Sequence, residues 1–559
     1  MNTENNSLLC SIRKSVIGEN HTIHTAFGEK PLVYADYTAS GRSLSMIEDF
    51  IRERVLPCYA NTHTEASFTG AQTSKLREEA RAQISKAVNA NEDYALIFCG
   101  SGATAAIDKL ITILNLRKPR QLNGDDVLLQ QVPEQQRPVI FIGPYEHHSN
   151  ELPWRESIAD VVTIPLTEDG LLDHDYLEAQ LQKHQARSLK IGSFSAASNV
   201  TGIKTRVEEV AALLHQYGAH SFWDYAAAAP YVAIDMQSVA LHQGDNSKDA
   251  VFISPHKFIG GPGTPGVLVV KRSLLKNSVP AVAGGGTVVY VTPENHQYIA
   301  DEERREEGGT PAIVESVRAG LVFKLQQQVG TDVIEKLEGA FLSSALDRWN
   351  ASPNIRILGN TESPRLSIVS FQIMHKQHEL HYNYVVALLN DLFGIQARGG
   401  CSCAGPYGHS LLHMDMSTSK AIEGQLKEGQ MILRPGWVRL NFNYFLDQEN
   451  FDYIVDAVEL IALHGWKLLP LYKFDADKGI WCYQGEAENN MFSLHDICFD
   501  LHLAPPATDT SPARKALSEY MFAAKQILEQ AKCCSTNFPI EMSDTANKVR
   551  RFVLPQEVG

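Results

Sequence analysis

The stretch SPHKFIGGPGTPGVLVVK, residues 254–271, decides the fold because it sets Lys257 in a Gly/Pro-rich turn between two apolar strand candidates. These strand candidates are AVFI at 250–253 and GVLVVK at 266–271. A lysine that is partly desolvated at the end of a strand can lose its proton and form an imine with an aldehyde. Most lysines are solvated surface groups, so this role for Lys257 depends on what surrounds the turn.

Apolar runs alternate with helix-period segments around this stretch, from about residue 70 to residue 272. Residues 71–91 and 206–217 show the apolar spacing of helices that cover a core on one face. The buried-strand candidates are 94–99, 138–143, 189–195, 220–224, 250–253 and 266–271. This alternation predicts an α/β fold with a mainly parallel sheet flanked by helices, in which ligands bind at the carboxyl ends of the strands.

The composition is that of a globular protein, and its charge limits the classes of ligand. Of 559 residues, 44% are hydrophobic and 21% are charged, and the formal net charge is -15. Nucleic acids and anionic membranes need clustered lysine and arginine, so we expect neither as a partner, although a small anionic cofactor needs only a local basic pocket. The start of the chain does not resemble a signal peptide, no stretch is long and apolar enough for a membrane span, and nine irregularly spaced cysteines indicate free thiols in a cytoplasmic protein.

A chain of this length is expected to divide into domains. We expect an N-terminal segment at 1–30 that packs on the smaller domain, a large domain at 31–320, a smaller α+β domain at 321–470 and a C-terminal extension at 471–559. After about residue 320, a long helical pattern leads to the strand candidates RLSIVSFQI and WVRLNFNY. The extension contains a predicted loop, APPATDTSP at 504–512, and a helical pattern, SEYMFAAKQILEQA.

Asp224 ends the strand candidate HSFWD and is followed by small residues. A carboxylate in that place can pair with a protonated pyridine nitrogen, which makes the ring an electron sink and lets a Cα proton leave. An ordinary helix N-cap is the alternative for Asp224 taken alone. The position of Lys257 in the next strand loop favours the pairing role.

The segment GSGAT, residues 100–104, lies between a strand candidate and a helix candidate. Gly100 and Gly102 permit close approach of the backbone, the helix N-terminus attracts a phosphate, and Thr104 can add a hydroxyl. The segment also matches the dinucleotide fingerprint G-x-G-x-x-A, so a nicotinamide-dependent dehydrogenase is an alternative. That fingerprint expects an acidic residue at the end of a second strand, whereas Asp125 and Asp126 stand in a polar stretch, RKPRQLNGDDV.

The segment EHHSNELPW, residues 146–154, follows the strand candidate at 138–143. The imidazole of His147 can stack on a pyridine ring and move protons. A loop histidine bonded to the backbone is the alternative when this segment is taken alone.

The order of these motifs resembles the cysteine desulfurase and selenocysteine lyase branch of the class V aminotransferase family. The resemblance spans about residues 30–460 and includes YADYTASGR at 34–42, YANTH at 59–63, SNVTG, WDYAA, SPHK and GGTP at 308–311. It implies a fold-type I enzyme that uses pyridoxal 5'-phosphate (PLP), with a large domain on a mainly parallel sheet and a smaller α+β domain.

The resemblance also implies roles for individual residues. The ring contacts would be Lys257 as the Schiff base, Asp224 at the pyridinium nitrogen, His147 stacked on the ring and Asn199 near the ring hydroxyl. The phosphate contacts would be Gly102, Thr104, Ser254 and His256. Thr310 would reach the phosphate of a neighbouring subunit, because the family's site lies at a homodimer interface.

The segment ARGGCSCAGPYGH, residues 397–409, resembles the family loop that carries a nucleophilic cysteine. The family has an arginine five residues before that cysteine, which matches Arg398 and Cys403, and Cys401 is a second thiol. A nearby arginine favours the reactive thiolate. The resemblance implies that Lys257 removes the Cα proton of L-cysteine and that Cys403 takes the sulfur as a persulfide and releases alanine. Arg439 would clamp the substrate carboxylate, and Arg398 would be a second substrate-binding residue.

Other interpretations of these residues stay open. C-x-C with His409 and His413 nearby is an alternative metal site, but the usual spacing is C-x-x-C, and we expect no metal. Both cysteines can be inert in a PLP-dependent aminotransferase, epimerase or β-lyase, or the chain can be a silent binding protein. The leading prediction is an enzyme that abstracts sulfur or selenium from L-cysteine or an analogue, with a sulfur-acceptor protein as a further partner.

Overall fold

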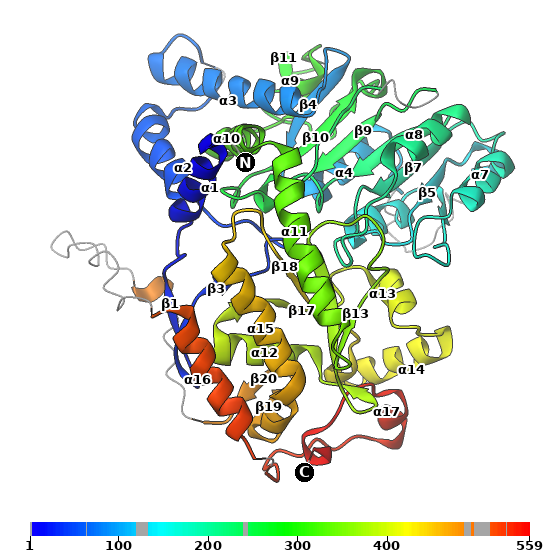
Figure 1. The fold of residues 1–559 in the computed structure, drawn as a ribbon. Coiled ribbons are helices and arrows are strands. Elements are labelled where there is room, and N and C mark those ends of the chain that lie inside the picture. Colours follow the sequence, from blue (N-terminus) through cyan, green and yellow to red (C-terminus); the bar gives the residue numbers. More distant parts are fainter. Residues whose placement is uncertain are drawn as a thin grey trace.

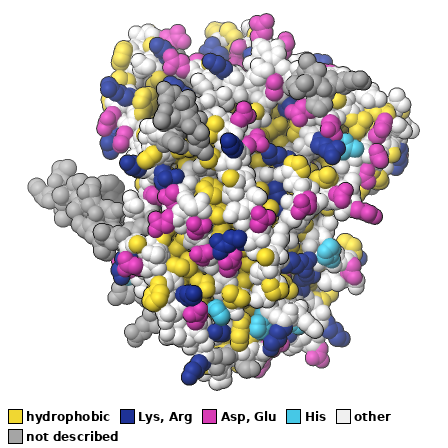
Figure 2. All heavy atoms as spheres, in the orientation of Figure 1, with side chains coloured by type: hydrophobic (Ala, Val, Ile, Leu, Met, Phe, Trp, Pro, Cys, Tyr) yellow, Lys and Arg dark blue, Asp and Glu magenta, His cyan; other side chains and the backbone are white. Residues whose placement is uncertain are grey.

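The computed structural model describes residues 3–62, 64–118, 132–238, 244–485, 493–496, 515–532 and 534–558. His63, Asp125, Asp126 and the loop predicted at 504–512 lie outside these residues. Figure 1 shows a larger lobe above a smaller one, with the long helix α11 (Thr331–Asn350) running between them. On the face drawn in Figure 2, basic and acidic side chains are interspersed. Within the described ranges, no helix combines the length and the apolar character of a membrane span.

A seven-stranded sheet in the order β4-β10-β9-β8-β7-β5-β6 forms the centre of the larger lobe. Its strands are β4 (Tyr94–Cys99), β5 (Val139–Ile142), β6 (Asp160–Thr163), β7 (Lys190–Ser195), β8 (His220–Asp224), β9 (Ala250–Ile253) and β10 (Gly266–Lys271). β10 is antiparallel to β4 and β9, and the other neighbouring pairs are parallel. The sequence analysis missed only β6, an edge strand that is partly exposed and so lacks a buried apolar run.

Helices cover both faces of this sheet, because alternate side chains of a strand point to opposite sides. The helices of this lobe are α1 (Thr3–Ser15), α2 (Ser45–Phe50), α3 (Phe68–Ala87), α4 (Gly102–Ile113), α6 (Leu152–Arg155), α7 (His174–Lys183), α8 (Val207–Gln216), α9 (Glu302–Glu306) and α10 (Ile313–Val329). Ile97 and Phe252 pack with α4 on one face, whereas Phe98 and Trp223 belong to the core under α3, α8 and α10 on the other. The predicted α/β class with a mainly parallel sheet is confirmed.

An antiparallel sheet in the order β13-β14-β18-β17, with β15 beside β14, forms the smaller lobe. Its strands are β13 (Ile355–Ile357), β14 (Ile368–His375), β15 (His378–Glu379), β17 (Arg398–Gly400) and β18 (Trp437–Asn441). The helices that follow α11 are α12 (Tyr382–Phe393), α13 (Gly405–Leu411), α14 (Met416–Lys427), α15 (Gln448–His464), α16 (Leu517–Gln530) and α17 (Asp544–Val549). The remaining strands are β1 (Thr22–Thr25), β2 (Gly28–Pro31), β3 (Val33–Tyr34), β11 (Val288–Val291), β12 (His296–Tyr298), β16 (Ile395–Gln396), β19 (Tyr472–Asp475) and β20 (Ile480–Tyr483).

Both ends of the chain pack into these lobes. Trp481, Leu528 and Phe552 of the C-terminal extension are buried in the core of the smaller lobe, so the extension completes that core. The N-terminal segment, expected on the smaller domain, divides: Ile12 of α1 joins the core of the larger lobe, whereas β1 and β2 contact α12. The domain boundaries at 320 and 470 stay predictions.

Two carboxylates satisfy outer backbone groups of β4, an edge strand of the larger sheet. Glu303 accepts a hydrogen bond from the Leu96 N–H at 2.9 Å, and Glu307 accepts one from the Phe98 N–H at 2.7 Å. Glu307 also pairs with two buried guanidinium groups, those of Arg77 at 2.6 Å and Arg81 at 2.9 Å. These contacts fix the strand that leads into the GSGAT segment.

We expect Glu307→Gln to lower the free energy of unfolding by about 3–5 kcal/mol, because it removes the buried carboxylate that pairs with both buried guanidinium groups. Urea unfolding of the purified protein measures this change. Glu78→Gln is the matched control, since Glu78 pairs with Arg81 at 2.9 Å from a side chain that is 59% exposed, and such a pair contributes at most about 1 kcal/mol. Equal losses in the two variants would contradict the structural role of Glu307.

Candidate active site

A cavity of about 970 Å³ opens where the carboxyl ends of β4, β5, β7, β8 and β9 meet. Each site residue that the sequence predicted lies in its wall: Gly102, Thr104, His147, Asn199, Asp224, Ser254, His256, Lys257, Thr310, Arg398, Cys403 and Arg439. Thr310 lines the cavity of its own chain. The fold therefore brings together side chains that are up to about 340 residues apart in the sequence.

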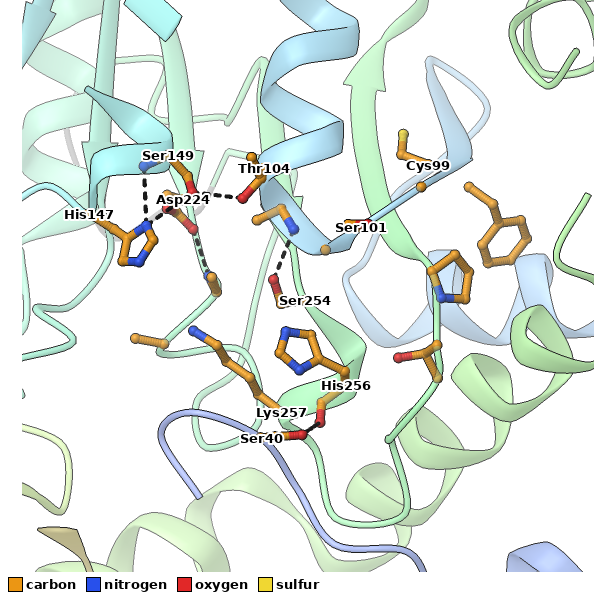
Figure 3. A pocket seen from close by; sticks show the side chains of 18 of the residues that line it. Ser40, Cys99, Ser101, Thr104, His147, Ser149, Asp224, Ser254, His256 and Lys257 are labelled. Atoms are coloured by element: carbon orange, nitrogen blue, oxygen red, sulfur yellow. Dashed lines mark hydrogen bonds between the residues drawn. The ribbon is translucent and has the colours of Figure 1, made fainter. Parts of the chain in front are cut away.

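Lys257 and Asp224 come from neighbouring parallel strands. Lys257 ends a 3₁₀ turn, Pro255–Lys257, after β9, and Asp224 is the last residue of β8. Burial lowers the pKa of the Lys257 amine to about 8; Asp224 opposes this shift, and Arg439 and Arg398 add to it. Burial raises the pKa of the Asp224 carboxyl, against a hydrogen bond from the Ala226 N–H at 2.8 Å and the charge of Lys257. Figure 3 shows the Lys257 amine directed toward the side of the cavity that carries Asp224 and His147.

His147 is held as a neutral imidazole. The Ser149 N–H donates to His147 Nδ1 at 3.1 Å, so the proton of the neutral ring lies on Nε2. Burial, then the charges of Lys257, His148 and Arg439, lower the pKa of His147 to about 3. The ring can therefore stack on an aromatic ligand and offer a hydrogen bond without carrying a charge.

The N-terminus of α4 forms a cradle with Ser254 and His256. The Ala103 N–H donates to Ser254 Oγ at 2.8 Å. Gly102 has a φ of +58°, and a Cβ on it would lie 2.9 Å from Ser254 Oγ, so only glycine leaves this space open. Burial, then the charge of Lys257, lower the pKa of His256 to about 4. Thr104 Oγ1 lies 2.7 Å from Ser149 Oγ, so the hydroxyl at the predicted anion site is tied to the His147 turn (Figure 3).

The cysteine loop after β17 is attached to the larger lobe by hydrogen bonds to its carbonyl groups. The side-chain amide of Asn199 donates from Nδ2 to the Ser402 carbonyl at 2.8 Å, and the backbone N–H of His148 donates to the Cys403 carbonyl at 2.8 Å. Ser402 and Cys403 have φ values of +53° and +54°, a left-handed conformation that these contacts maintain.

Only one of the two loop thiols faces the cavity. Cys403 is exposed and lines the cavity wall. Cys401 packs against the cluster that contains Tyr407 and Trp437. The structure therefore places Cys403, the thiol that the resemblance selected, and not Cys401, in the cavity wall.

Sequence reasoning missed Asp36 as a site residue. Asp36 Oδ1 lies 3.0 Å from Arg439 Nη2, and Asp36 Oδ2 lies 3.0 Å from Arg398 Nε. Arg439 also donates from Nη1 to the Asn199 carbonyl at 3.0 Å. The acidic residue in YADYTASGR was the available signal, but its arginine partners lie more than 300 residues away.

Glu146, next to His147, is a second residue that the sequence analysis did not identify. Its carboxylate accepts hydrogen bonds from Gly143 N at 3.2 Å, Ser195 N at 2.9 Å, Ser195 Oγ at 2.6 Å and Asn150 Nδ2 at 2.7 Å. Burial raises the pKa of Glu146 to about 7, against these hydrogen bonds. Glu146 ties the His147 turn to the end of β7, and the signal for it was the acid that opens EHHSN.

Several polar atoms of the cavity wall are buried without a partner among the described residues. They are Thr38 Oγ1, Asn199 Oδ1, Ser402 Oγ and Arg439 Nε. Buried polar groups in proteins are normally hydrogen-bonded, so these four atoms are available to bond a polar ligand.

An amine of lowered pKa, a buried carboxylate, a neutral imidazole and a helix N-terminus line one cavity, an arrangement suited to an aldehyde-bearing aromatic cofactor. The model of the family described as Aminotransferase class-V matches residues 33–453, and the chain belongs to this family. The family consists of PLP-dependent enzymes, as the resemblance predicted, and not of nicotinamide-dependent dehydrogenases.

Curated relatives and solved structures agree with the family. A probable cysteine desulfurase of Halalkalibacterium halodurans is 28% identical over 380 residues, which are 67% of this chain and 85% of the relative. A cysteine desulfurase of Enterobacter sp. is 28% identical over 381 residues, with the same shares. The apo structure of a cysteine desulfurase from Thermococcus onnurineus has a TM-score of 0.62 at 21% identity and covers 81% of this chain and 97% of that one. A cysteine desulfurase of Escherichia coli has a TM-score of 0.59 at 21% identity, with 77% and 94% covered. The predicted fold-type I architecture is confirmed.

The lowered pKa of Lys257 predicts selective reaction with a small aldehyde in the protein freed of any cofactor. At pH 7.4 an amine of pKa about 8 is about 20% unprotonated, against about 0.1% for an unshifted lysine. We expect reductive alkylation with glyoxylate and cyanoborohydride to label Lys257 at least about tenfold faster than the exposed Lys427. Peptide mass spectrometry measures both rates, and equal labelling would contradict the desolvated amine.

Proposed function

We propose that this protein is a PLP-dependent cysteine desulfurase-like enzyme that transfers the sulfur of L-cysteine, or the selenium of its analogue, to Cys403 and releases alanine. One observation carries the proposal: Lys257, Asp224, Cys403 and Arg439 share the wall of one cavity. The names of the relatives support the same reaction.

The residues of the cavity fit PLP. The unpartnered Asn199 Oδ1 would accept the hydrogen bond of the ring hydroxyl, and the space that a Cβ at Gly102 would fill suits a phosphate beside Ser254 and His256. Lys257 would hold the aldehyde, and Asp224 would face the ring nitrogen. When bound, PLP supplies an electron sink for the bonds of the substrate Cα.

Lys257 is the group that would move the Cα proton. An amine with a pKa near 8 can both take and return a proton close to neutral pH. Arg439 would orient the substrate, since its buried Nε is free to donate to a carboxylate. His147, neutral at the cavity wall, would pack on the ring without adding charge.

Cys403 is the group that would take the sulfur. Its thiolate attacks the substrate sulfur, an S–S bond forms as the C–S bond breaks, and the electron pair stays with the substrate carbon, which gains a proton and leaves as alanine. The substrate carbon is reduced and Cys403 is oxidised to a persulfide, so no external oxidant is required. Arg439 and Arg398 lie in the same wall as Cys403. A thiol of an acceptor protein would then remove the sulfur.

We further propose a homodimer in the cytoplasm. Thr310 is exposed at the cavity wall, where a second subunit could share it. The hairpin of β11 and β12 exposes Val289, Tyr290 and Val291, and an apolar hairpin of this kind suits a subunit contact. Seven described cysteines are free thiols, as in a reducing compartment.

We expect the purified protein to show a visible absorption band of PLP that Lys257→Ala removes or shifts, because Lys109, the other lysine among the described residues of the cavity wall, is bound to Glu306. Lys427→Ala, on an exposed part of α14, should keep the band unchanged. Absorbance spectra before and after added PLP measure both variants. An unaltered band in Lys257→Ala would contradict the assignment of Lys257 as the residue that holds PLP.

We expect Cys403→Ser to reduce the formation of alanine and sulfide from L-cysteine by at least about 100-fold, because a hydroxyl cannot form the persulfide. Cys401→Ser is the matched control, two residues away in the same loop, and should retain activity within about threefold. Both products are measured with a reducing thiol present. Full activity in Cys403→Ser would reject the persulfide mechanism.

A further inference from the structure

Two arginines stand directly opposite one another at the cavity. Arg398 of β17 is the register partner of Arg439 of β18. Like charges opposite each other in an antiparallel pair are destabilising, and the penalty grows with burial. Arg439 is 2% exposed. The pair therefore needs a negative group between its members.

Asp36 supplies that group. One carboxylate oxygen lies 3.0 Å from Arg439 Nη2, and the other lies 3.0 Å from Arg398 Nε. The backbone beside it is fixed on two sides, because the Ala35 N–H donates to the Gln396 carbonyl and the Asn441 N–H donates to the Ala35 carbonyl, both at 3.0 Å. The carboxylate is thus held in place against two arginines of the cavity wall.

The cluster keeps unused donor capacity next to Asp36. Arg439 Nε is buried without a partner among the described residues, and so is the hydroxyl of Thr38, two residues after Asp36. Two arginines and one aspartate leave one positive charge in excess. One carboxylate of an incoming ligand balances that charge. A second carboxylate would need the place between Arg398 and Arg439, which Asp36 already occupies.

We infer that Asp36 is a specificity-determining residue that restricts this cavity to amino acids with a single carboxylate. It does so by occupying the place between Arg398 and Arg439 that a second acidic group would take. The inference rests on the proposed amino-acid substrate and narrows its class: L-cysteine and L-alanine fit, and amino acids with an acidic side chain are rejected.

The test uses the PLP-loaded protein with L-alanine and L-aspartate, neither of which has sulfur to transfer. Titration of the cofactor's visible absorption gives a Kd for each amino acid. We expect the unaltered protein to bind L-alanine at least about tenfold more tightly than L-aspartate. In Asp36→Asn, the ratio of the two Kd values should move toward L-aspartate by about 10- to 100-fold, because a repulsive charge is replaced by a donor.

Two further variants separate specificity from a merely structural effect. Asp160→Asn is the matched control: Asp160 also lies between two arginines, Arg187 at 2.8 Å and Arg137 at 3.7 Å, but on β6 away from the cavity wall. The ratio of the Kd values for L-alanine and L-aspartate in Asp160→Asn should equal that of the unaltered protein. Asp36→Asn combined with Arg398→Gln removes one charge of each sign and should return the ratio to within about threefold of the starting value.

The outcomes are distinct. An unaltered protein that binds both amino acids equally overturns the inference without any variant, even if Asp36→Asn does not fold. An unchanged ratio in a folded Asp36→Asn that retains the PLP band also overturns it. Selective binding of L-alanine without sulfur release from L-cysteine would instead contradict the proposed desulfurase and support the inference about Asp36. No spectral response to either amino acid would overturn both.

Discussion

The desolvation of the Lys257 amine is the constraint on which the rest of the site depends. A lysine in water is almost fully protonated at neutral pH, and only burial makes its free amine accessible. The sheet achieves this because β8 and β9 are adjacent and parallel, so that Asp224 and the turn after Ile253 emerge at the same edge. The charge of Asp224 raises the pKa of the amine, whereas the charges of Arg439 and Arg398 lower it. The resulting pKa of about 8 is a balance between burial and four charged groups, those of Asp224, Arg439, Arg398 and Asp36, which come from both lobes.

The second requirement is that a thiol from the smaller lobe be held against the larger lobe. Two hydrogen bonds to the backbone of the cysteine loop provide this attachment: the His148 N–H donates to the Cys403 carbonyl, and the Gly405 N–H donates to the side-chain Nε2 of His148 at 3.1 Å. His148 therefore serves both sides of the cysteine, while its neighbour His147 faces the cavity. Because Glu146 anchors the same turn to β7, the position of the thiol is fixed through the large sheet. The C-terminal extension supports this arrangement from behind, since Arg551 donates to the Leu412 carbonyl at 2.9 Å beyond the end of α13.

The sequence predicted those features of the fold and the site that depend on residues close together in the chain. Strands buried on both faces appear as apolar runs, and the turns that follow them at the carboxyl edge carry Asp224, His147 and Lys257, so these residues were identifiable before their neighbours were known. β6 was missed because its side chains are only partly buried. Asp36 was missed for a different reason, because the arginines that it contacts lie on strands hundreds of residues later in the chain. Only the register of β17 with β18 shows that these arginines share one counter-charge. The division of the N-terminal segment between the two lobes also has no local signal.

Three carboxylates in or beside the cavity wall have charged or hydrogen-bonding partners, and the buried polar atoms beside them that lack a partner among the described residues differ from them in this respect. Asp224 faces Lys257, Asp36 lies between two arginines, and Glu146 accepts four hydrogen bonds. Asn199 Oδ1 and Arg439 Nε, by contrast, are buried without partners among the described residues, and a ligand that bonded them would offset about 1–3 kcal/mol for each atom. The two atoms belong to residues joined by a hydrogen bond from Arg439 to the Asn199 carbonyl. One ligand assembly in the cavity can therefore satisfy both, with a ring hydroxyl at Asn199 and a carboxylate at Arg439.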